Sequence, residues 1–224
     1  MTLTVHHLNN SRSQRVLFLL EELGTPYEIK RYQRDPKTML APDSLKAIHP
    51  LGKSPLLTDG GITLAETGAI IEYLAAGYDD GTLMPPRGTE EGRRVVFYLH
   101  YAEGSLMPLM LLSLAFSSLP RQVPFLLKPL MKAVEAGARA RFLGPQLALH
   151  LDFLERELSG RPWFAGDRFT VADIQMSFPV EIAAFRQKQL GAARPNLQNW
   201  LDRLHARPAY VRALERGGPY KLAG

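Results

Sequence analysis

The segment Leu64–Ile71 places a carboxylate and a hydroxyl, those of Glu66 and Thr67, at the start of a predicted helix. The first N–H groups of a helix have no partners within the helix, and the helix dipole favours negative charge there. Such a helix start can bind the carboxylate of a small ligand. The alternative is that Glu66 and Thr67 only complement the helix dipole.

A second segment, Lys53-Ser54-Pro55-Leu56-Leu57, puts a proline at the mouth of a predicted strand. Because proline cannot donate a ladder hydrogen bond, Pro55 must lie at a strand start or a sheet edge. A cis Ser54-Pro55 bond would expose the backbone of Ser54 to a ligand, whereas a trans loop proline is much the commoner case. Taken alone, the segment is compatible with either.

The chain contains no cysteine, which excludes a disulfide framework, a thiolate metal site and a cysteine nucleophile. Any thiol chemistry must therefore come from a ligand. The histidines have no metal-ligand spacing with carboxylates, so we expect no metal and interpret them as surface or core residues. They are His6, His7, His49, His100, His150 and His205.

The formal net charge is +5, yet the basic residues are spread along the 224-residue chain. This predicts a mild preference for small anions and no nucleic-acid partner. The longest uncharged stretch, between Glu103 and Arg121, is interrupted by Pro108 and by serines, so we expect a buried helix and no membrane insertion. The opening MTLTVHHLNN lacks the features of a secretory signal, so we expect a cytoplasmic protein.

The first 77 residues have the element order β-α-β followed by β-β-α, which is typical of a thioredoxin-like domain. Gly24 closes the first helix, whose βαβ unit requires a parallel strand pair, and Gly60-Gly61 indicates a hairpin. The expected elements are a strand at 3–8, a helix at 13–23, a strand at 27–32, a short helix near 44–48, two strands around Gly60-Gly61 and a helix at about 66–76.

Residues 78–88 are rich in turn-forming types and predict a linker, after which every strong periodic signal up to residue 224 is helical. We therefore expect an N-terminal domain at 1–77 and an all-α domain at 89–224. Within the second domain, Thr170 can cap a helix and Asp173 can complete a capping box, a structural motif. The expected helices are 89–118, 124–158, 170–187 and two shorter ones after Pro195 and Pro208.

Three motifs together resemble the glutathione S-transferase superfamily: G-K-S-P-L-L, A-E-T-G-A-I-I-E-Y-L and F-T-V-A-D-I. The resemblance spans essentially the whole chain. It implies that the Ser54 backbone, before a cis Pro55, pairs with the cysteinyl unit of glutathione, and that Glu66 and Thr67 hold its γ-glutamyl end. Lys53 resembles the contact to the glycyl carboxylate, although a solvated surface lysine is the alternative. Family members more often have Val at the Ser54 position and Ser at the Thr67 position.

The free thiol of glutathione has a pKa near 8.5, so catalysis requires a group that stabilises its thiolate. The family places this group in the turn after the first strand, which leads here into a helix N-terminus, and Ser11 is our first candidate. Ser11 could instead cap the helix, as Ser13 could. Asn10 and Ser13 are further candidates for the thiolate contact, and Arg12 has a supporting electrostatic role. A tyrosine mechanism is disfavoured because His6 and His7 stand where the family's tyrosine would.

The second substrate is expected against the helical domain, where apolar side chains with adaptable methionines line one helix. Packing in the core or in a dimer is an equally good explanation of these residues, which include Leu106, Met107, Met110 and Leu111. The resemblance implies a homodimeric detoxification enzyme that conjugates glutathione to small hydrophobic electrophiles, with glutathione peroxidase activity as an extension. The alternative is a non-catalytic protein that binds glutathione and hydrophobic ligands.

Overall fold

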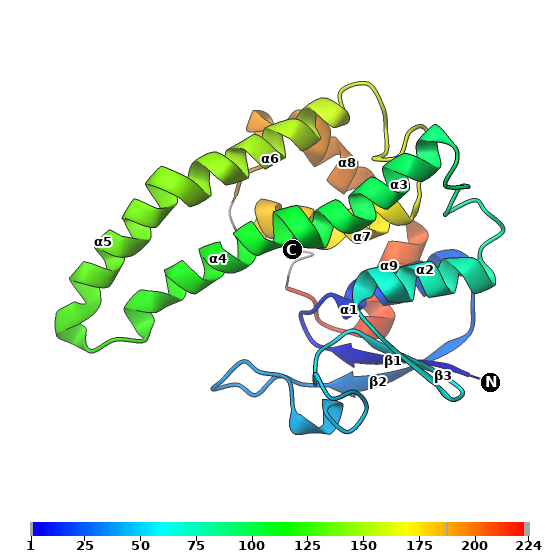
Figure 1. The fold of residues 1–224 in the computed structure, drawn as a ribbon, viewed down its shortest axis with the longest axis horizontal. Coiled ribbons are helices and arrows are strands. Elements are labelled where there is room, and N and C mark those ends of the chain that lie inside the picture. Colours follow the sequence, from blue (N-terminus) through cyan, green and yellow to red (C-terminus); the bar gives the residue numbers. More distant parts are fainter. Residues whose placement is uncertain (1, 187, 222–224) are drawn as a thin grey trace.

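The computed structural model describes residues 2–186 and 188–221 and consists of a sheet-containing N-terminal part and a helical C-terminal part (Figure 1). The sheet has the strand order β2-β1-β3-β4. β1 and β2 are parallel, as the βαβ unit predicts, and β3 pairs antiparallel with both β1 and β4. The strands are β1 (Leu3–Leu8), β2 (Tyr27–Tyr32), β3 (Leu56–Asp59) and β4 (Ile62–Ala65).

Two helices of the N-terminal part, α1 (Ser13–Leu23) and α2 (Thr67–Tyr78), cover one face of the sheet (Figure 1). α1 ends at Gly24, which has the left-handed φ of 64° that favours glycine at a helix C-terminus. On the other face, the short 3₁₀ helix Asp43–Leu45 stands where a short helix is predicted, and Leu45 packs there with Leu8, Tyr32 and Leu56. The β-α-β, β-β-α order of a thioredoxin-like domain is therefore confirmed.

The C-terminal part has helices and no strand among its described residues, and the expected long helices are interrupted by π-helical turns. The predicted helix at 170–187 ends in such a turn, and residue 187 lies outside the described residues. The helices are α3 (Glu90–Tyr101), α4 (Met107–Ser118), α5 (Lys128–Ala138), α6 (Gly144–Glu157), α7 (Val171–Glu181), α8 (Pro195–His205) and α9 (Pro208–Gly217), and the π-helical turns are Ala102–Leu106, Arg139–Leu143 and Ile182–Arg186.

α7 is the central helix of the molecule, and all eleven of its residues are buried. Thr170 and Asp173 form a capping box at its start. The Asp173 carboxylate also accepts hydrogen bonds from the Phe164 N–H at 3.0 Å and the Trp200 indole N–H at 2.8 Å. The cap thus joins the start of α7 to the preceding loop and to α8.

α4 and α5 form an arm that projects away from the rest of the molecule (Figure 1). The helical run Glu90–Arg121 has 32 residues and meets the length and composition of a membrane span, a property that core helices of soluble proteins share. The expectation of a buried helix is wrong for most of α4, since only three of its residues are buried. The buried ones are Met107, Leu109 and Met110, whereas Leu111, Leu112 and Leu114 are exposed.

Candidate active site

Three segments meet at one end of the sheet because of its strand register. β3 begins at Leu56, which pairs with His6 of β1 on one side and with Ala65 of β4 on the other. The turn after β1, the Ser54-Pro55 segment before β3 and the start of α2 after β4 therefore lie around the same rung of the sheet. The register brings together the three segments that the sequence singles out separately.

The Ser54-Pro55 peptide bond is cis. Pro55 is buried, and Ser54 is partly exposed beside it. The Ser54 hydroxyl donates to the carbonyl oxygen of His6 at 3.2 Å, which ties the segment to β1. Lys53 is exposed.

Glu66 is the residue immediately before α2 and has a φ of 71°, a left-handed value that non-glycine residues seldom adopt. Its side chain is exposed and caps no helix N–H, whereas Thr67 is buried at the first position of the helix. Backbone strain of this kind is concentrated at functional sites. The free N–H groups of α2 and the exposed Glu66 carboxylate thus stand beside the cis-proline segment.

Ser11 lies in the turn before α1, and its hydroxyl belongs to a cluster of three serines. Ser11 Oγ lies 2.7 Å from Ser13 Oγ and 3.4 Å from Ser54 Oγ, and it accepts the Ser13 backbone N–H at 3.2 Å. Ser13 Oγ also lies 2.9 Å from His7 Nδ1 and 3.3 Å from the carbonyl oxygen of Leu8. Ser11 therefore accepts an N–H at the start of α1 and still has a hydroxyl proton of its own.

The C-terminal segment lies against the same turn. Asn10 has a φ of 49°, and its side-chain oxygen accepts the backbone N–H of Lys221 at 2.8 Å. Gly217, at the end of α9, approaches α1 so closely that a Cβ there would meet Gln14 Oε1 at 2.8 Å and Leu17 Cδ1 at 2.9 Å. Any side chain at this position would therefore require the ends of Gln14 and Leu17 to shift.

His7 is buried beneath the serine cluster. Burial, assisted by the positive charge of Arg31, lowers the pKa of His7 to about 4, although a hydrogen bond with the Gly217 backbone partly opposes this. His7 is therefore neutral at neutral pH, and its Nδ1 faces Ser13.

Arg12 and Arg15 share one carboxylate of the helical domain. Arg12 Nε lies 3.0 Å and Arg15 Nη1 2.6 Å from Oε1 of Glu103, which lies in the π-helical turn after α3. Both guanidinium groups also lie near the ring of Phe178 in α7. Burial alone would raise the pKa of Glu103, but the guanidinium groups of Arg15 and Arg12 outweigh it and hold that pKa below its usual range.

The apolar residues proposed for the second substrate lie elsewhere than expected. Leu106, Met107 and Met110 are 0%, 6% and 3% exposed and belong to the main hydrophobic core. Leu111 is 62% exposed on α4. Three of the four side chains are therefore packed inside the monomer and line no open surface.

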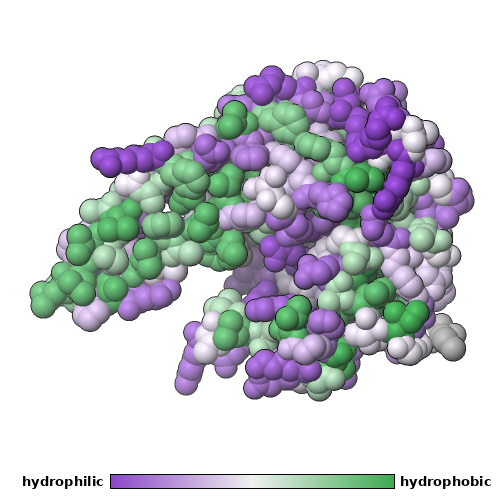
Figure 2. Space-filling view, viewed as in Figure 1, coloured by the Kyte–Doolittle hydropathy of each residue, from purple (hydrophilic) through white to green (hydrophobic). Residues whose placement is uncertain are grey.

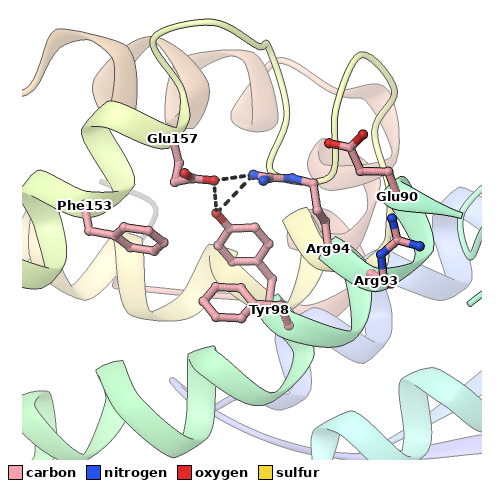
Figure 3. A pocket seen from close by; sticks show the side chains of 7 residues that line it. Glu90, Arg93, Arg94, Tyr98, Phe153 and Glu157 are labelled. Carbon is pink, nitrogen blue, oxygen red and sulfur yellow. Dashed lines mark hydrogen bonds and ion pairs between the residues drawn. The ribbon is translucent and has the colours of Figure 1, made fainter.

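An open groove of about 450 Å³ lies on α3 and α6, on an outer face of the helical part (Figure 3). Phe97 and Phe153 line it, and the Tyr98 hydroxyl donates to Glu157 at 3.1 Å, beside the Arg94–Glu157 ion pair. Its lining includes no residue of the three segments at the sheet end. Among residues 2–186 and 188–221, no group of three or more histidine or acidic side chains could hold a metal ion.

Several residues around the site are not apparent from the sequence. Arg15 and Glu103 are 88 positions apart, and no local pattern indicates that they meet. His7 stands in a strand and has the appearance of a core histidine. The glycine pair at 217–218 is the one local signal that the C-terminal segment approaches another element closely.

A thioredoxin-like domain with a cis proline before β3, followed by an all-helical domain, defines a two-domain class of glutathione-binding protein. Residues 1–76 match the glutathione S-transferase N-terminal domain family, and residues 126–208 match the corresponding C-terminal domain family. Glutathione S-transferase 3 of Schizosaccharomyces pombe is 34% identical, over 96% of this chain and 87% of the relative. Glutathione S-transferase 1 of Saccharomyces cerevisiae is 32% identical, over 95% and 94%.

Among solved structures, a glutathione S-transferase from Actinobacillus pleuropneumoniae superposes with a TM-score of 0.82 and is 32% identical, covering 98% of this chain and 94% of that one. The chain belongs to the glutathione S-transferase family of enzymes, which use glutathione as a substrate.

Proposed function

We propose that the protein binds glutathione at the sheet end, stabilises its thiolate with the Ser11 hydroxyl and transfers it to a small electrophile with an apolar body. Glu66, Thr67 and the N-terminus of α2 would hold the γ-glutamyl end, the Ser54 backbone the cysteinyl unit, and Lys53 the glycyl carboxylate. Lowering the thiol pKa by two units would raise the thiolate fraction at pH 7 from about 3% to about 75%.

The observation that favours Ser11 over its neighbours is the set of acceptors around each hydroxyl. Ser13 lies within reach of two better acceptors, His7 Nδ1 at 2.9 Å and the Leu8 carbonyl at 3.3 Å, and Ser54 donates to the His6 carbonyl. Among the residues that the structure describes, the Ser11 proton has only other hydroxyl oxygens within hydrogen-bond distance. A thiolate is a charged acceptor and forms a stronger hydrogen bond than a hydroxyl oxygen does.

The test is the ultraviolet absorbance of the thiolate of bound glutathione, titrated with pH. We expect a thiol pKa about two units below that of free glutathione in the wild type, and a rise of about one unit in Ser11→Ala, the equivalent of one hydrogen bond to a charged group. Ser13→Ala and Asn10→Ala are the matched variants from the same turn. An effect in either of them and none in Ser11→Ala would move the role to that residue.

A second candidate function is a non-catalytic protein that binds glutathione and hydrophobic ligands. The departure of the turn at residues 10–13 from the family's usual residues motivates it. In the same titration, tight glutathione binding with an unshifted thiol pKa would favour this function over the transferase.

We extend the proposal to organic hydroperoxides, whose O–O bond the same thiolate would cleave. The products would be an alcohol and glutathione sulfenic acid, which a second glutathione would reduce to the disulfide and water.

We also propose that the protein is a cytoplasmic detoxification enzyme and is not inserted in membranes. The absence of cysteine from the chain is compatible with that compartment.

We further propose that the protein is a homodimer in which α4 and α5 contribute to the interface. The family resemblance implies a homodimer. The arm is our candidate interface, because α5 has no buried residue although it carries several large apolar side chains. Apolar side chains gather over the arm in the space-filling view (Figure 2). Exposed ones on the arm are Leu111, Leu112, Leu114, Phe125, Leu126, Leu127, Leu130 and Val134.

A further inference from the structure

The helical domain meets the Ser11 turn through a charged surface. The apolar side chains expected to line the second-substrate site, Leu106, Met107 and Met110, are enclosed in the core. What reaches across the domain boundary to Arg12, the residue after Ser11, is the carboxylate of Glu103 and the ring of Phe178.

The charges in this cluster do not balance, because Arg12 and Arg15 share the single carboxylate of Glu103. Arg15 is 1% exposed, and its Nε and Nη2 have no hydrogen-bond partner among the described residues. A guanidinium group remains charged even when it is buried. One positive charge is therefore in excess beside Ser11, where solvent only partly screens it.

Arg12 is the member of the cluster that can meet a ligand. Its side chain is 35% exposed, and only its Nε is occupied by Glu103. In the part of the chain that the structure describes, its two terminal nitrogens have no hydrogen-bond partner. Glu103 and Phe178 hold the guanidinium in place, so little side-chain entropy remains to be lost when an anion binds.

We propose that this cluster makes the second-substrate site selective for aromatic electrophiles that carry a carboxylate, with Arg12 as the residue that binds the carboxylate. The inference rests on the proposed transfer of glutathione and specifies its substrate class. The aromatic body of such a substrate would lie toward Phe178, and its anionic group would accept the hydrogen bonds that the terminal nitrogens of Arg12 leave open.

The test compares 4-chloro-3-nitrobenzoate with 4-chloro-3-nitrobenzamide, which share a ring and differ in charge. The thiolate forms a C–S bond at the carbon that bears chlorine, and chloride leaves with the bonding pair. With rates divided by those of the uncatalysed reactions, we expect kcat/KM to favour the benzoate by about ten-fold or more in the wild type. Arg12→Gln should abolish that preference, and Arg12→Lys should restore part of it because the charge returns.

Arg93→Gln, which removes an exposed arginine of α3, is the matched control and should leave the ratio unchanged. The thiol pKa of bound glutathione is measured in the same variants. An equal loss for both electrophiles, with a raised thiol pKa, would overturn the inference and assign Arg12 to the thiolate. An unchanged ratio in Arg12→Gln would leave the cluster as an interdomain ion pair only.

A binding measurement separates this inference from the proposed function. The conjugate S-(4-carboxy-2-nitrophenyl)glutathione and its carboxamide counterpart can be made chemically and titrated by calorimetry, so no turnover is needed. We expect about ten-fold tighter binding of the carboxylate, and loss of that difference in Arg12→Gln. Equal affinities would overturn the inference even if glutathione transfer is observed, whereas absent transfer with a clear difference would overturn only the proposed function.

Discussion

At the residue scale, the turn between β1 and α1 assigns different tasks to side chains that look alike in the sequence. Both serines are buried, but the Ser13 hydroxyl lies against His7, whereas Ser11 accepts an N–H at the start of α1. Among the described residues, the Ser11 proton has no better acceptor than a neighbouring hydroxyl. A difference of two positions thus separates a structural hydroxyl from the one proposed to bind the thiolate.

The buried His7 predicts a loss of stability in acid. Its pKa is about 4 in the folded protein and about 6.5 in the unfolded chain, so the unfolded state binds more protons between these values. The free energy of unfolding should therefore fall as the pH is lowered through this window, by about 2 kcal/mol between pH 7 and pH 5.

Urea denaturation across the pH range measures this effect, and His7→Asn should flatten the curve because asparagine does not titrate. His100→Asn, at an exposed position, is the control and should follow the wild type. If His7→Asn keeps the wild-type slope, another group is responsible, the nearest candidate being His6, whose pKa burial and Lys30 also lower.

At the scale of the element, α7 depends on its N-terminal cap. Asp173 accepts N–H groups from Thr170, Phe164 and Trp200, so one carboxylate fixes the helix start, the preceding loop and α8. Because all of α7 is buried, loss of the cap at its first turn would disturb the packing of both domains.

Asp173→Ala should lower the free energy of unfolding by about 3 kcal/mol or more, since it leaves several buried N–H groups without acceptors. Asp167→Ala, the same change at an exposed position shortly before α7, should change it by less than about 0.5 kcal/mol. Denaturation gives both values, and calorimetry should show an unchanged glutathione affinity per folded molecule. Normal thermal stability with lost affinity would instead mean that Asp173 serves the ligand.

At the scale of the whole molecule, the two domains are joined next to the site. Arg15, from the N-terminal domain, donates to Glu103 and to Gln175 of α7, and Gly217 lets α9 pack against α1. The arm of α4 and α5 is the opposite case, because large apolar side chains on it contact no other part of the described chain closely enough to be buried.

The proposed homodimer predicts a solution mass of about twice the 25.0 kDa of the chain in light scattering. Leu130→Lys, on the exposed face of α5, should shift the protein toward monomer without loss of folding, because the side chain is 57% exposed in the monomer. Val211→Lys, on α9 and also exposed, is the control and should remain dimeric. A monomeric wild type would contradict the proposal that α4 and α5 form a dimer interface.

Local patterns in the sequence were sufficient for most of the elements, whereas the class of site came from the resemblance of three motifs to a known family. Period-2 and period-3.6 spacing predicted the strands and helices, Gly24 the end of α1 and Thr170 with Asp173 the start of α7, because each of these depends on neighbours within a few positions. Pro55 and the Glu66–Thr67 pair were recognised for the same reason. Their meeting at one rung of the sheet is set by the strand register, in which Leu56 pairs with His6 and with Ala65.

Only the tertiary structure decided what surrounds Ser11. The Arg15–Glu103 pair, the contact between Asn10 and Lys221, and the burial of Met107 and Met110 join or enclose segments far apart in the chain. An apolar periodicity indicates that one face of a helix will be buried. Which elements bury that face depends on how the two domains pack and on the path of the last helix. The charge beside the thiolate site therefore could not be predicted from the sequence.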